Sequence, residues 1–160
     1  MHGLRTFLDR LIQLFCISLL GVMVAVALWQ VASRYVFGSP STLSEEFLRF
    51  ALIWISIMGA AYVAGQSQHV SMSLFVDLMP LRGQLKWGMA IQIVFLLFAV
   101  SVLIMGGGRA VSISMTQISP VLQIPMGLIY SALPVSGVII VLYSLINIFD
   151  LYRTYRVHED

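Results

Sequence analysis

Four long apolar stretches alternate with short polar segments along the chain. They cover residues of about 8–32, 46–64, 87–108 and 126–149, and the third can continue as helix toward residue 116. A hydrocarbon core about 30 Å thick requires about 20 apolar helical residues to cross it. The pattern therefore predicts an all-α integral membrane protein with four transmembrane helices. Because little of the chain is left over, we expect residues 1–160 to form a single four-helix membrane domain.

The first apolar stretch also has features of a cleaved signal peptide. Arg5 and Arg10 precede it, and Ala25-Val26-Ala27 has the form of a cleavage site. However, the apolar run is longer than the 7–15 residues typical of a signal-peptide core. We therefore interpret this stretch as a retained span.

The lysines and arginines of the short loops predict the orientation in the membrane. One side carries six of them, namely Arg5, Arg10, Arg82, Lys86, Arg153 and Arg156. The other side carries three, namely Arg34, Arg49 and Arg109. Because cytoplasmic loops are enriched in basic residues, we expect both termini to lie in the cytoplasm.

The segments between the spans have patterns of their own. Residues 69–80 (HVSMSLFVDLMP) fit both a period of two and a helical period, so we expect a short amphipathic interfacial segment between the second and third helices, either helical or extended. Gly106-Gly107-Gly108 indicates the end or a loosening of the third span. Pro125 suits the first turn of the fourth helix, and Pro134 should bend that helix by freeing the carbonyl of Tyr130.

Small residues four positions apart occur in the second span. Ala60 with Ala64, and Ala61 with Gly65, could allow another helix to approach closely. Such pairs also arise by chance in apolar helices, so the pattern indicates a contact face without identifying what it contacts.

Composition supports a membrane protein and argues against other classes. The chain is 59% hydrophobic and only 10% charged, whereas soluble domains carry about 25% charged residues. There are too few polar residues to cover a soluble core, so membrane lipid is the expected surrounding. The net charge of +2 is too small to predict binding to nucleic acid.

Candidate chemistry within the spans is sparse. Every Asp, Glu, Lys and Arg lies at a span end or in a loop, whereas ion coupling or catalysis in a membrane usually needs ionisable groups inside the spans. The three histidines are far apart, and Cys16 is the single cysteine, interpreted as an inert buried thiol. Without a phosphate-binding loop or a catalytic set, we expect no enzyme activity, no metal site and no cofactor.

Charged residues do gather at the predicted outer side, at the start of the second span. In STLSEEFLR, Thr42 or Ser44 can cap the helix, and Thr42 with Glu45 has the form of a capping box. Arg49 follows Glu45 by four residues and Glu46 by three, so it can pair with either. Capping explains the glutamates better than it explains an arginine one turn inside the apolar run.

A partner protein at the outer surface would explain the remaining charges. The residues that we predict to contact such a partner are Arg34, Glu45, Glu46, Arg49 and Arg109.

An ordered set of motifs resembles a known transporter family. The set comprises Arg34-Tyr35-Val36-Phe37-Gly38-Ser39-Pro40, Ser44-Glu45-Glu46 with Arg49-Phe50, Gly59-Ala60-Ala61, His69-Val70, Asp77-Leu78 and Pro120-Val121-Leu122-Gln123-Ile124-Pro125-Met126-Gly127. No single motif is specific, but together they span nearly the whole chain. In this order they resemble the small membrane subunit of tripartite ATP-independent periplasmic (TRAP) transporters.

The resemblance implies a function as well as a fold. Such a transporter is a secondary active symporter of the bacterial inner membrane, usually driven by sodium, which imports organic acids such as sialic acid or C4-dicarboxylates. A periplasmic binding protein delivers the substrate, and a large elevator-type membrane subunit holds the substrate and sodium sites. The small subunit would then be a scaffold within a hetero-oligomer and would hold no substrate itself.

Two other interpretations predict different residues. A self-contained small exporter acting as a dimer would need a carboxylate embedded in the membrane for proton coupling. An intramembrane enzyme or redox subunit would need paired histidines or a polar catalytic set inside the spans. The sequence places neither feature there.

Overall fold

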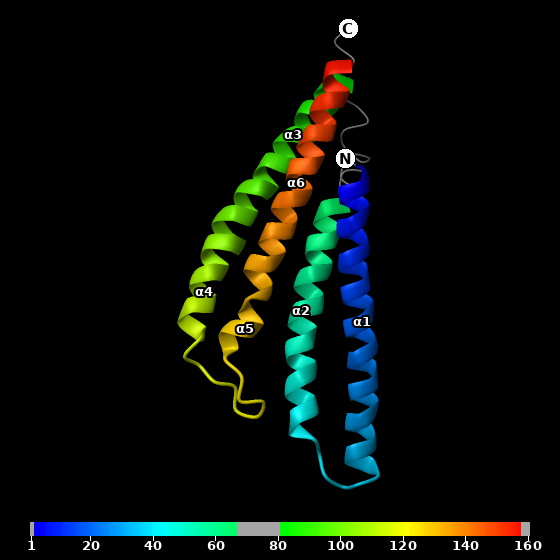
Figure 1. The fold of residues 1–160 in the computed structure, drawn as a ribbon, viewed down its shortest axis with the longest axis vertical. Coiled ribbons are helices and arrows are strands. Elements are labelled where there is room, and N and C mark those ends of the chain that lie inside the picture. Colours follow the sequence, from blue (N-terminus) through cyan, green and yellow to red (C-terminus); the bar gives the residue numbers. More distant parts are fainter. Residues whose placement is uncertain (1, 67–80, 158–160) are drawn as a thin grey trace.

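Helices make up most of the chain in a computed structural model that describes residues 2–66 and 81–157. The helices are α1 (His2–Tyr35), α2 (Thr42–Gln66), α3 (Leu81–Phe98), the π-helical η1 (Ala99–Gly106), α4 (Gly107–Ser114), α5 (Met126–Tyr130) and α6 (Ala132–Val157) (Figure 1). Across these described ranges there is no β-strand, only one isolated bridge between Ile118 and Pro125. The all-α prediction is confirmed.

Four helical stretches are long and apolar enough to cross a membrane. They cover Arg5–Tyr35, Thr42–Gln66, Trp87–Ser114 and Met126–Tyr152. The four predicted spans are therefore confirmed, and each helix extends beyond its apolar centre because the polar residues at its ends continue the backbone hydrogen bonding. The third span runs to Ser114, close to the longer of its two predicted ends. The predicted interfacial segment, residues 69–80, lies outside the described residues.

The helices form an open row. Helix α1 packs on α2, α2 packs on α6, and α6 packs on α3 and η1, in the order seen across Figure 1. The chain exposes 10483 Å², whereas a compact protein of this mass exposes about 8,000 Å². The row therefore presents broad apolar faces that only lipid or another protein can cover.

The centre of the row is built from small residues. Ala61 of α2, Ala99 of η1 and Ile140 of α6 form a buried cluster. A Cβ added to Gly137 of α6 would lie 2.8 Å from the Cβ of Leu103, so the missing side chain allows η1 to approach α6 closely. Of the two predicted small-residue pairs, Ala61 with Gly65 is buried, whereas Ala60 is exposed.

Local breaks in the helices follow glycine and proline. The π-helical η1 ends at Gly106 and the helix continues from Gly107, so the triple glycine marks a loosening and not an end. The fourth span is interrupted at Ser131, between α5 and α6, three residues before Pro134, as the proline predicts. Pro125 has an extended backbone and precedes the first turn of α5 as its N-cap, and so lies one position earlier than predicted.

Candidate functional site

The two ends of the row differ, and each is named here by its chain segments. The loop end carries the α1–α2 loop (residues 36–41) and the α4–α5 loop (residues 115–125). The terminal end carries the start of α1 and the end of α6 (Figure 1). All five predicted partner-contact residues belong to segments near the loop end.

Helix α2 begins at the loop end with a serine cap. The hydroxyl oxygens of Ser41 and Ser44 lie 2.9 Å apart, and the backbone N–H of Ser44 donates to the Ser41 hydroxyl at 3.4 Å. Ser41 is therefore the N-cap, and the prediction of Thr42 or Ser44 was wrong. Ser41 lies just before the first helical residue, where its oxygen can reach the N–H three positions later.

Glu46 turns inward, unlike its neighbour Glu45. Its side chain is only 8% exposed, and its Oε2 atom accepts hydrogen bonds from the backbone N–H groups of Val121, at 3.1 Å, and Leu122, at 2.6 Å. Two successive N–H groups of this kind form a concave anion site. Glu46 thus joins the N-terminal part of α2 to the tip of the α4–α5 loop, which follows it by 75 residues along the chain.

The α4–α5 loop has a defined conformation of its own. At its base the backbone N–H of Met126 donates to the carbonyl of Gln117 at 2.8 Å, and that of Ser119 donates to the carbonyl of Ile124 at 3.0 Å. Ser119 is 1% exposed. Near the tip Gln123 has a φ of 55°, in the left-handed region, so most of this loop is held by bonds within the chain.

The other predicted contact residues remain on the surface. Glu45 pairs with Arg49 at 3.4 Å, and the two side chains are 62% and 69% exposed. Arg34 and Arg109 are also exposed, and Arg34 lies in the last turn of α1, where its charge meets the negative end of the helix dipole. These four side chains are available to a partner, and their contact with one stays a prediction.

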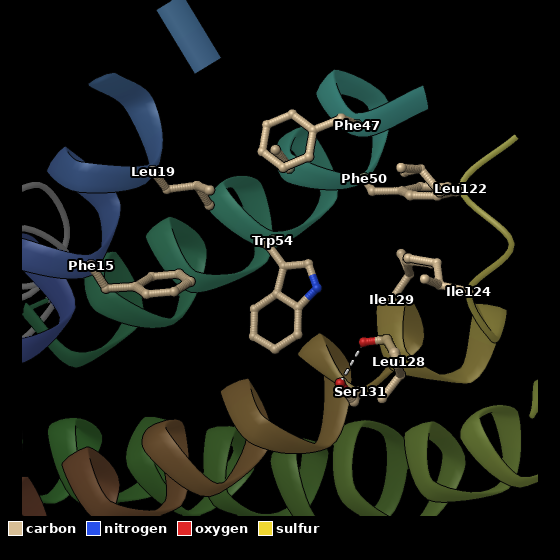
Figure 2. A pocket seen from close by; sticks show the side chains of 11 residues that line it. Phe15, Leu19, Phe47, Phe50, Trp54, Leu122, Ile124, Leu128, Ile129 and Ser131 are labelled. Atoms are coloured by element: carbon tan, nitrogen blue, oxygen red, sulfur yellow. Dashed lines mark hydrogen bonds between the residues drawn. The ribbon is translucent and has the colours of Figure 1, made fainter. Parts of the chain in front are cut away.

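An apolar cavity of about 560 Å³ lies near the Glu46 contact. Figure 2 shows the ring of Trp54 among its lining residues, with Phe15 of α1 on one side and Leu122 and Ile129 on the other. The lining has two polar side-chain groups, the indole N–H of Trp54 and the hydroxyl of Ser131, and the Ser131 hydroxyl donates to the carbonyl of Leu128. The cavity therefore offers an almost wholly apolar surface.

Sequence reasoning missed this cavity, although part of its signal was present. Phe47, Phe50 and Trp54 recur at positions i, i+3 and i+7, which places them on one face of a helix. The spacing predicts an aromatic stripe on α2. It does not show which other helix faces that stripe.

At the terminal end, polar side chains connect three helices. The pairs are Asp9 and Gln13 on α1, Tyr62 and Gln66 on α2, and Tyr143 and Asn147 on α6. The Tyr143 hydroxyl donates to Asp9 at 2.5 Å, and the amides of Gln13 and Gln66 donate to the Tyr62 hydroxyl at 2.7 and 3.0 Å. The Asn147 amide donates to the carbonyl of Gly65 at 3.2 Å.

This polar group was also missed, and its signal is a spacing. In each helix the two residues are four positions apart, so they lie on one face. The sequence shows three such faces without showing that they meet.

Comparison with known proteins places the chain in a family. The model of the DctQ component of tripartite ATP-independent periplasmic transporters matches residues 23–154. The chain belongs to this family. It is the small permease component of a TRAP transporter, as its four membrane-spanning helices and the ordered motifs predicted.

Individual relatives agree with the family model. A Haemophilus influenzae protein named as a TRAP transporter small permease protein is 30% identical over 142 residues, which cover 88% of this chain and 86% of that protein. The sialic acid TRAP transporter small permease protein SiaQ of Vibrio cholerae is 26% identical over 150 residues, which cover 94% of this chain and 86% of that protein.

One further relative is a larger protein. The sialic acid TRAP transporter permease protein SiaT of Haemophilus influenzae is 30% identical over 64 residues, which cover 40% of this chain and only 10% of that protein.

The described part of the small permease component contains few side chains that could bind a metal ion or take part in catalysis. Within residues 2–66 and 81–157, no three His, Cys, Asp or Glu side chains lie close enough together to hold a metal ion. The carboxylates of Asp9 and Glu46 both accept hydrogen bonds from this chain. What the two ends offer is contact surface.

Proposed function

We propose that this small permease component is the scaffold of a TRAP transporter, bound to a large membrane subunit that carries the substrate and sodium sites. The complex acts as a symporter in the bacterial inner membrane and imports an organic acid delivered by a periplasmic binding protein. The names of the relatives SiaQ and SiaT support sialic acid as one substrate of this class. C4-dicarboxylates belong to the same proposed class.

The open row of helices is the observation that carries the scaffold proposal. Apolar side chains on lipid-facing helices gain nothing from burial against each other, so close packing must select a partner. Only 6% of the most hydrophobic stretch of the first span, counted by residues, is buried within this chain. A large membrane subunit would cover such a face, and we expect the chain to be stable chiefly as part of that hetero-oligomer.

The cavity supports the view that the substrate is held elsewhere. A carboxylate substrate requires cationic or N–H donors around it. The lining of the 560 Å³ cavity is apolar except for the indole N–H of Trp54 and the hydroxyl of Ser131, which already donates to the carbonyl of Leu128. An organic acid would lose its hydration there and meet no cationic group, with the indole N–H of Trp54 as the remaining donor.

The relative SiaT supports the association with a larger permease. A stretch of this chain matches one tenth of that protein. That protein therefore contains a segment similar to a small permease. Two components can share one polypeptide if they remain in contact, so the match supports their association.

Transport assays test the proposal directly. We expect the purified small component in liposomes with an inward sodium gradient to take up no sialic acid or dicarboxylate. Co-expression with a large TRAP permease subunit should yield a complex, which transports when the binding protein is added. Uptake by the small component alone would favour the self-contained exporter and overturn the scaffold proposal.

The orientation requires a separate test. In a Cys16→Ser background, Gln117→Cys at the loop end should react with a membrane-impermeant maleimide added to intact spheroplasts. Gly3→Cys at the terminal end is the matched control and should react only after the membrane is opened. The reverse pattern would show that the termini lie outside.

A further inference from the structure

The α4–α5 loop is held at its base, its middle and its tip. The base is closed by the bond from Met126 to Gln117, and the middle by the buried Ser119. The tip is held by the carboxylate of Glu46, which reaches it from another helix. Surface loops are normally the most mobile and variable parts of a protein, so a loop with this much internal bonding is preformed.

The backbone of the loop also has an unfavourable conformation that needs support. Gln123 is the one non-glycine residue with positive φ in the described part of the chain. Its side-chain amide donates to the carbonyl of Pro120 at 3.1 Å, which bridges the tip. Strained residues of this kind persist only where the surroundings hold them, and they are concentrated at binding sites.

The surface that the loop presents lies beyond the membrane spans. The third span ends at Ser114 and the fourth begins at Met126, so the loop faces water and not hydrocarbon. Its exposed side chains are Met115, Thr116, Gln117, Ile118, Pro120 and Gln123. None of them is charged, which disfavours an anion or a lipid headgroup as the ligand.

Apolar side chains surrounded by amides are typical of the contact surface between two proteins. Ile118 is 62% exposed although it is large and apolar. A preformed loop also loses less conformational entropy on binding than a mobile one. A soluble protein that approaches from the aqueous side fits both features.

We propose that Glu46 is a positioning residue, which holds the α4–α5 loop in the shape that docks the soluble substrate-binding protein. The proposal rests on the proposed function, because it needs that partner. In this arrangement Glu46 acts through the loop backbone and does not itself touch the partner. The docking contacts are made by Ile118 and its exposed neighbours.

The experiment uses the complete complex of small and large permease subunits in nanodiscs, with the binding protein as the probe. Glu46→Gln removes the charge but keeps an acceptor oxygen, and Glu46→Ala removes the acceptor as well. We expect the dissociation constant of the binding protein to rise by about tenfold with Gln, as for one weakened charge-assisted bond, and further with Ala. In transport, KM for the loaded binding protein should rise while the maximal rate changes little.

Hydrogen exchange separates positioning from a general loss of stability. The amide protons of Val121 and Leu122 should exchange faster in Glu46→Gln, while those of α6 keep the parent rate. Glu45→Gln makes the same change of charge one residue away and should leave the exchange of both loop amides unchanged. Equal exchange in the two variants would overturn the positioning role.

A surface variant keeps the test decisive if Glu46→Ala fails to fold. Ile118→Ser changes an exposed side chain and should weaken binding as Glu46→Gln does, without faster exchange at the tip. If the large subunit copurifies and both Glu46→Gln and Ile118→Ser bind the substrate-binding protein as the parent does, the inference is overturned. Failure of the large subunit to copurify with the parent chain would instead contradict the proposed function.

Discussion

The terminal end and the loop end join the helices of the row by different means. At the terminal end, side chains of α1, α2 and α6 bond to one another, and Gly65 lies against the ring of Tyr143. At the loop end, an apolar cavity lies between α2 and α5, and Glu46 of α2 reaches the backbone of a loop. One end is closed by close packing, and the other is bridged by a single carboxylate.

This difference shows how a row of apolar helices keeps its shape in lipid. Hydrogen bonds between membrane helices contribute about 0.6 kcal/mol on average, so several must act together. The terminal end combines several such bonds with close backbone approach. The loop end depends on fewer contacts and stays more open, which suits the docking that we propose for it.

The largest expected effect is at Gly65, where a larger side chain would push apart helices α2 and α6 at the terminal end. A Cβ at this position would lie 2.5 Å from ring atoms of Tyr143. We expect Gly65→Ala to destabilise the chain by about 3 kcal/mol, the upper range for overpacking, as measured by SDS titration in mixed micelles. In Gly59→Ala the new Cβ meets nothing within 4 Å, so this control should unfold at the parent midpoint or slightly above it. Equal midpoints would show that α6 can move away from α2 freely.

A smaller effect on stability is expected from replacing Glu46, because its side chain makes contacts only at the loop end. Glu46→Ala leaves the N–H groups of Val121 and Leu122 without their acceptor, a loss of about 2 kcal/mol for a charge-assisted bond. In a Cys16→Ser background, Ala51→Cys in the cavity lining should react faster with a small apolar maleimide once Glu46 is replaced. An unchanged rate would mean that the carboxylate does not hold the two sides together.

Removing the hydroxyl of Tyr143 tests one hydrogen bond at the terminal end, the bond to Asp9. Tyr143→Phe removes the donor to Asp9 but keeps the ring over Gly65, so we expect a loss of about 1 kcal/mol. Tyr152→Phe, at an exposed position of the same helix, is the control and should cost nothing measurable. In a double-mutant cycle with Asp9→Asn the two losses should not add. Fully additive losses would argue that the two residues do not interact.

The smallest effect on stability is expected at the exposed pair of Glu45 and Arg49. Exposed pairs of this spacing contribute about 0.3–0.5 kcal/mol, so Arg49→Ala should leave insertion and the unfolding midpoint of the isolated chain nearly unchanged. Its effect should appear in the complex, as weaker copurification of the large subunit or slower transport, whereas Glu45→Gln should change both little. If the Arg49→Ala complex assembles and transports like the parent, Arg49 has no role in partner contact.

Local features of the site could be read from the sequence only in part. The pair of Glu45 and Arg49 follows from their spacing of four, and the interruption before Pro134 follows from the missing N–H. The cap at Ser41 was predicted one or three residues too late, at Thr42 or Ser44, because neighbouring serines and threonines have equivalent capping groups. The inward turn of Glu46 had no local signal, since the N–H donors that it binds, those of Val121 and Leu122, lie 75 and 76 residues further along the chain.

The sequence by itself determined the number of spans, their approximate limits and the family, because hydropathy, helix length and ordered motifs are properties of neighbouring residues. Only the tertiary structure decided the order of helices in the row, the meeting of three polar faces at the terminal end and the cavity beside Trp54. The physical reason is that lipid is as apolar as the side chains, so hydrophobicity does not select which face meets which helix. That choice is made by glycine-sized gaps such as Gly65 and by polar atoms that must find a partner, and both depend on residues far apart in the chain.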